Sequence, residues 1–147
     1  MSRNAKIVAA IAVVVVMAAV ATVLSMKFFM STPDDLDLAR SKPSANGLYQ
    51  VSIEPELEPV EQGALHAWIV TVSSPDGKPV TDATLTLDGG MPQHGHGLPT
   101  RPQSAGPIGE GRYRIEGVRF NMSGWWMLKV GIDASAGKDE ADFNIVL

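Results

Sequence analysis

The segment from Met91 to His96 carries the side chains with the clearest coordination chemistry in the chain. Its sequence, MPQHGH, places two imidazoles one residue apart and a thioether three residues before the first of them, His94. In extended backbone, residues two apart point to the same side, roughly 6.5–7 Å apart at Cα, so both imidazoles can meet one ion. Neighbouring glycines let the backbone adjust, and prolines restrict it. The segment predicts a metal-binding loop, with a plain polar turn as the alternative.

A second methionine, Met122, stands in a similar setting between two expected strands. Surface loops rarely need methionine for packing, and alternate loops of a β-sandwich gather at one end. We therefore expect Met122 to approach the histidine loop. Both Met91 and Met122 also have an alternative role, because methionine fills irregular gaps in a core.

A mixed set of imidazole and thioether donors favours copper. Thioether sulfur is soft and prefers Cu(I), whereas imidazole serves either oxidation state of copper. Zinc is more usually bound by cysteine, histidine or carboxylate, and the chain has no cysteine and the loop no acid. Since neutral imidazole is the ligand, we expect copper binding to weaken as the pH falls through about 6.

The N-terminal region bears on the compartment that this loop occupies. The run from Ile7 to Met26 carries no charge, and a helix of roughly 20 residues crosses the hydrocarbon layer of a bilayer. Arg3 and Lys6 precede the run, so the positive-inside rule predicts one span of the inner, cytoplasmic membrane within residues 1–29, with the remainder in the periplasm or outside. A cleaved signal peptide is the alternative, although its apolar core is usually only about 7–15 residues long.

Composition argues against several classes of function. Without cysteine, the chain has no disulfide framework, thiolate metal site or thiol nucleophile. The chain has 12 basic and 16 acidic residues, and no basic cluster with interleaved aromatics, so we expect no nucleic-acid binding. The sequence contains no Gly-x-Ser-x-Gly elbow, phosphate-cradling glycine loop or His-Glu-x-x-His motif, so we do not expect an enzyme.

Short segments of alternating polarity are expected to position the loop. Residues 30–47 are rich in proline, serine and aspartate and predict a flexible linker, whereas residues 48–147 predict one β-domain. Its six or seven short strands, separated by turn signals, predict an all-β, immunoglobulin-like β-sandwich preceded by one transmembrane helix, with a small Greek-key barrel as the alternative. At Gly117 the apolar alternation shifts by one residue, which predicts a β-bulge.

The motif MPQHGHG is followed by the strand GRYRIEGVRF and then by FNMSGWW. In order and spacing these motifs resemble the YtkA-like domain family, which is related to the FixH-like proteins, over about residues 48–147. The resemblance implies an exported or membrane-tethered immunoglobulin-like sandwich, and it points to Met91, His94, His96 and Met122. Some members of the family accompany copper-handling or cytochrome oxidase assembly systems.

These patterns together predict a membrane-tethered periplasmic copper-binding protein that acts as a chaperone, an assembly factor or a tolerance factor. His94 and His96 are the expected primary ligands, with Met91 and Met122 completing a soft site. The expected partners are the membrane, through the N-terminal helix, and a membrane copper acceptor or oxidase assembly complex. The alternative is a metal-free immunoglobulin-like interaction module of a membrane complex, with Trp125 as its contact residue.

Overall fold

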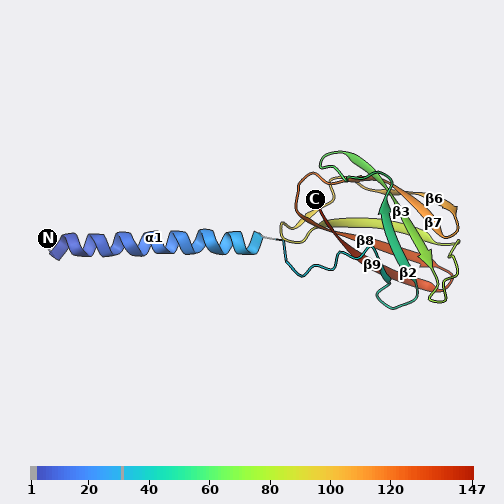
Figure 1. Ribbon diagram of the computed structural model, residues 1–147, viewed down its shortest axis with the longest axis horizontal. Helices are drawn as coiled ribbons and strands as arrows, with labels where there is room; N and C mark the ends of the chain where they lie inside the picture. The colour runs from blue at the N-terminus through green and yellow to red at the C-terminus, as the bar shows by residue number, and fades with distance from the viewer. Residues whose placement is uncertain (1–2, 31) are drawn as a thin grey trace. The chain divides into compact units, whose positions relative to one another are not determined.

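The computed structural model describes residues 3–30 and 32–147, in two compact units, Met1–Pro33 and Asp34–Leu147. The first unit is one helix, α1 (Arg3–Met30; Figure 1). Its segment Ile7–Met26 has a mean hydropathy of 3.0. A single N-terminal helix of this length and composition fits a single-pass membrane anchor.

The second unit consists of two antiparallel sheets (Figure 1). The five-stranded sheet has the order β1-β2-β3-β7-β6, and the four-stranded sheet has the order β5-β4-β8-β9. The strands are β1 (Ser41–Pro43), β2 (Gln50–Pro55), β3 (Leu65–Ser73), β4 (Thr84–Met91), β5 (His96–Gly97), β6 (Gln103–Gly109), β7 (Arg112–Arg119), β8 (Trp125–Ala134) and β9 (Gly137–Val146).

The connections between the longer strands are those of an immunoglobulin-like sandwich. If β2, β3, β4, β6, β7, β8 and β9 are taken in chain order as strands A to G, the sheets read A-B-E-D and C-F-G. This is the arrangement of the seven-stranded, constant-type domain. The two short strands, β1 and β5, extend the sheets beside β2 and β4. The expected immunoglobulin-like β-sandwich with an N-terminal helix is therefore confirmed.

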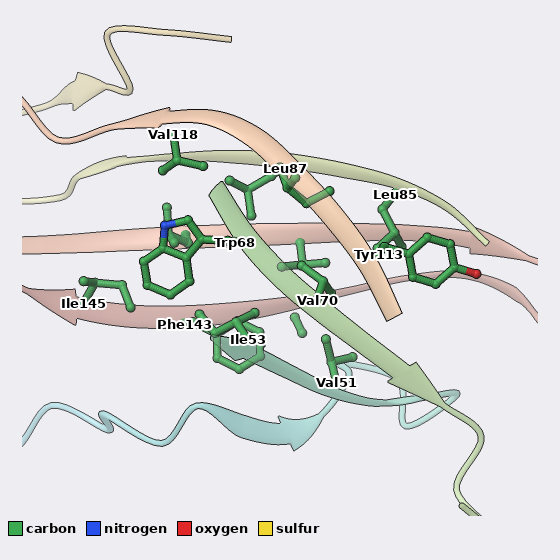
Figure 2. Packing of buried hydrophobic residues seen from close by; sticks show 14 of the residues in the cluster. Val51, Ile53, Trp68, Val70, Leu85, Leu87, Tyr113, Val118, Phe143 and Ile145 are labelled. Carbon is green, nitrogen blue, oxygen red and sulfur yellow. The ribbon is translucent and has the colours of Figure 1, made fainter. Parts of the chain in front are cut away.

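A single hydrophobic core fills the space between the sheets (Figure 2). Alternate residues point inward on the long strands, as Val51 and Ile53 do on β2 and Leu85 and Leu87 do on β4. Trp68 enters from β3 and is completely buried. Burial of apolar surface, at about 25 cal/mol per Å², is the main force that holds the two sheets together. The core lies entirely within the second unit, so a fragment of residues 34–147 retains all of it.

The β-bulge expected at Gly117 is present. The pairing of β3 with β7 shifts register between His66 and Trp68, opposite this glycine. Gly117 has a φ of 81°, a left-handed value that side chains other than glycine adopt only with strain. The glycine therefore permits the extra residue of the bulge.

The segment expected to be a flexible linker, residues 30–47, belongs largely to the domain in the structure. It contains β1, which pairs with β2, and the compact unit already begins at Asp34. The physical reason is a polar network around the buried carboxylate of Asp139. This carboxylate accepts hydrogen bonds from the Ser44 hydroxyl, at 2.6 Å, and from the backbone N–H of Asn46, at 3.1 Å. Its partners lie more than 90 residues away in the sequence, so local composition does not reveal the network.

Candidate metal centre

The two histidines lie in the hairpin that joins β4 to β5. β4 ends at Met91, whose carbonyl accepts hydrogen bonds from the N–H groups of His94, at 3.1 Å, and Gly95, at 3.0 Å. Gly95 has a φ of 64°, which favours glycine. The chain then turns back, and His96 pairs with Met91. The hairpin thereby holds both imidazoles beside the last residue of β4.

The imidazoles of His94 and His96 lie close enough to share an ion. Their ring centroids are 6.1 Å apart, and their planes are 8° from parallel. Two nitrogens bound to one ion, each at about 2 Å, lie roughly 3–4 Å apart, which rings at this separation reach by small side-chain rotations. His96 is exposed and His94 is half-buried, so an ion can enter from solvent.

Met91 points into the core. Its side chain is 2% exposed. Its methyl carbon lies 3.3 Å from the position that a Cβ on Gly124 would occupy, so it packs against the loop between β7 and β8. A thioether in this position fills the end of the core and can reach an ion at the surface only by leaving it. The contacts support the packing role of Met91.

Met122 lies in the loop between β7 and β8, which belongs to the same end of the sandwich as the histidine hairpin. The Trp126 indole N–H donates a hydrogen bond to the Met122 carbonyl at 3.0 Å, while the Met122 side chain is 36% exposed. The β2–β3 loop joins this end through a hydrogen bond from the Gly63 N–H to the Phe120 carbonyl, at 2.7 Å. The structure therefore places Met122 on a neighbouring loop, as alternate connections of a sandwich require.

Trp125, the expected partner contact, lies on the outer face of the four-stranded sheet. Its indole N–H donates a hydrogen bond to the Asn144 side-chain oxygen at 2.9 Å, and its ring is half-buried. Val146 pairs with it on β9 and is 48% exposed. The indole ring and Val146 thus form an apolar surface near the start of β8.

Met127 is a methionine to which the sequence patterns assigned no role. A groove of about 380 Å³ runs over β5, β4 and β8, and its lining includes His96 and Met127 but neither His94 nor Met122. Gly90 lies between them, paired with Gly97 on one side and with Met127 on the other. The signal that could have revealed Met127 was strand alternation, since the inward residues on either side of it leave it on the outer face.

Within residues 3–30 and 32–147, no group of three or more histidine, cysteine or acidic side chains is placed to hold a metal ion. A metal site at the hairpin would therefore have the imidazoles of His94 and His96 as its nitrogen donors and methionine thioethers as its further donors. Such a donor set fits a soft ion and does not fit the oxygen-rich sites of Mg²⁺ or Ca²⁺.

The family model for YtkA-like domains matches residues 44–131, which is more than half of the chain. The chain belongs to the YtkA-like family. The matched part of this YtkA-like protein runs from the segment after β1 into β8, so it contains the histidine hairpin and the groove. No curated protein and no solved structure matches the chain.

The close approach of β5 to β4 depends on Gly90 in this YtkA-like domain. A Cβ at Gly90 would lie well inside 3.0 Å of the His96 carbonyl oxygen, whereas a Cβ at Gly97 would meet nothing closer than 3.7 Å. We expect Gly90→Ala to displace the hairpin and to lower the free energy of unfolding by about 1–3 kcal/mol. Urea denaturation of fragment 34–147 measures this effect. Gly97→Ala is the matched control, expected within about 0.5 kcal/mol of the native value, and equal effects of the two variants would contradict the prediction.

Proposed function

We propose that this YtkA-like protein is a membrane-tethered copper-binding protein, with its domain on the periplasmic or outer side of the cytoplasmic membrane. It acts as a copper chaperone, an assembly factor or a tolerance factor. The observation that carries the proposal is the pair of nearly parallel, solvent-accessible imidazoles 6.1 Å apart on one glycine-containing hairpin.

The chemistry of the donors supports copper over other ions. His94 and His96 would hold the ion through neutral nitrogens, and a thioether would add a soft donor that Cu(I) prefers. Met122 offers such a sulfur at the same end of the sandwich, with its side chain partly exposed. Met91 is the weaker donor of the two, because its sulfur is enclosed in the core. Under this proposal, the protein binds the copper ion and later releases it.

The tether supports a role close to a membrane. α1 ends at Met30 and the compact unit begins at Asp34, so the connecting segment is short. Each residue of extended chain spans at most about 3.6 Å. Within the domain, Arg40 follows soon after the tether, and its guanidinium pairs with Glu58 of the β2–β3 loop at 2.6 Å. A short connection to a membrane anchor supports transfer of the ion to or from a membrane acceptor such as an oxidase assembly complex.

Titration of fragment 34–147 with Cu(I), Cu(II) and Zn²⁺ tests the proposal. We expect saturable binding of one copper ion per chain, with weaker binding of Zn²⁺. Absence of saturable copper binding would exclude the proposal. The second candidate would then be a metal-free interaction module, which the apolar surface formed by Trp125 and the exposed Val146 favours.

A further inference from the structure

We propose that the Met91 side chain positions the loop between β7 and β8, residues 120–124, and with it the Met122 thioether, relative to the histidine hairpin. This inference rests on the proposed copper site and concerns how its donors are brought together. Met91 acts through packing, and its own sulfur does not bind the ion. It is suited to this role because it contacts both segments that carry the proposed donors.

The backbone of Met91 holds the hairpin. Its carbonyl accepts the hydrogen bonds from the N–H groups of His94 and Gly95, at 3.1 and 3.0 Å, and His96 pairs with it across β4 and β5. Residues that pair directly on neighbouring strands present their side chains on the same face of the sheet. His96 therefore leaves the sheet on the same face as Met91. The backbone hydrogen bonds remain whichever side chain position 91 carries.

The side chain of Met91 supports the loop between β7 and β8. Its methyl carbon lies 3.3 Å from the position that a Cβ on Gly124 would occupy, and the side chain is 2% exposed. Gly124 also exchanges two backbone hydrogen bonds with Leu147, at 3.0 and 3.1 Å. The Met91 methyl therefore packs against a fixed point of the loop, two residues from Met122.

The position of Met122 depends on this loop. The Trp126 indole N–H donates a hydrogen bond to the Met122 carbonyl at 3.0 Å, and the Trp126 ring is fully buried. A shorter side chain at position 91 leaves a cavity beneath Gly124, and the structure around such a cavity relaxes partially into it. Even a partial shift of the loop changes the distance between the Met122 sulfur and the imidazoles. That change weakens binding, because metal–ligand distances vary by only about 0.2 Å.

The test compares two substitutions at position 91 in the full chain in detergent, by titration with Cu(I) in competition with a chromophoric Cu(I) chelator. Met91→Ala removes both the packing and the sulfur, and we expect it to weaken Cu(I) binding about tenfold. Met91→Leu removes the sulfur and keeps most of the volume, and we expect it to stay within about threefold of the native affinity. Equal losses in the two variants would make Met91 a ligand and overturn the inference, as would native affinity in Met91→Ala.

Two further variants separate positioning from loss of stability. Leu85→Ala opens a cavity in the core from the same strand, near its other end, and should keep the native Cu(I) affinity. In a Met122→Leu background, Met91→Ala should weaken Cu(I) binding by less than about twofold more, because its effect passes through the Met122 sulfur. Equal losses in Leu85→Ala and Met91→Ala, or additive losses from Met91→Ala and Met122→Leu, would contradict a positioning role.

A spectroscopic readout uses the native chain and requires no variant to fold. With ¹³C-labelled methionine methyl groups, Cu(I) is expected to shift the Met122 resonance strongly and the Met91 resonance only weakly. A strongly shifted Met91 resonance, or an unshifted Met122 resonance, would overturn the inference while leaving the histidine pair as the site. Failure of the native chain to bind Cu(I) would overturn the proposed function together with it.

Discussion

The double variant His94→Ala/His96→Ala is expected to bind Cu(I) at least about a hundredfold more weakly than the native chain, equivalent to roughly 2.7 kcal/mol. The two imidazoles are the nitrogen donors of the hairpin, and their removal leaves thioethers alone to hold the ion. Both side chains are at least partly exposed, so the free energy of unfolding should change by no more than about 0.5 kcal/mol. Competition titration measures the affinity, and urea denaturation measures the stability.

The third histidine of the chain provides a matched control. The His66 imidazole lies 2.8 Å from the Glu61 carbonyl oxygen and is tilted against the Phe120 ring at a centroid distance of 6.3 Å. It belongs to β3, in the other sheet. His66→Ala should therefore keep the native copper affinity. Equal losses in His66→Ala and in the double variant would indicate unspecific binding, and native affinity in the double variant would exclude the hairpin as the site.

Asp139→Ala is expected to lower the free energy of unfolding of fragment 34–147 by about 3 kcal/mol. The Asp139 carboxylate is buried and accepts hydrogen bonds from Ser44 and Asn46 and from the backbone N–H groups of Leu48 and Glu140. The substitution leaves these donors without their charged acceptor. It therefore loosens the segment between β1 and β2 from β9. Asp142→Asn, an exposed carboxylate on the same strand, is the control and should cost no more than about 0.5 kcal/mol.

The contribution of Asp139 is expected to depend on pH. Burial alone raises the pKa of this carboxyl, but the hydrogen bonds from Ser44, Glu140, Asn46 and Leu48 outweigh it and lower the pKa from 3.8 to about 2. A lowered folded-state pKa means that the stabilisation is complete above about pH 4 and is lost as the pH falls toward 2. The difference in unfolding free energy between the native fragment and Asp139→Asn should therefore shrink between pH 4 and pH 2. A difference independent of pH would show that the carboxylate charge contributes nothing.

Local patterns were sufficient for the elements of the fold. The uncharged run from Ile7 to Met26 specifies a helix that can span a bilayer, because hydropathy and length are properties of a continuous segment. Alternation of apolar residues specifies the strands and, at Gly117, the bulge, because each strand exposes one face to the core. The His-x-His spacing was likewise enough to predict that the two imidazoles lie side by side, since two residues of one hairpin determine it.

The parts that the sequence did not reveal all depend on residues distant from one another in the chain. The direction of Met91 depends on its packing against Gly124, and the attachment of residues 34–47 depends on Asp139. Met127 and Gly97 flank Gly90 only because β4 lies between β5 and β8. Sequence alone therefore determined the anchor, the strands and the histidine pair, which are local. Tertiary structure decided which thioethers face the core and which face outward, because that choice is made by contacts between strands.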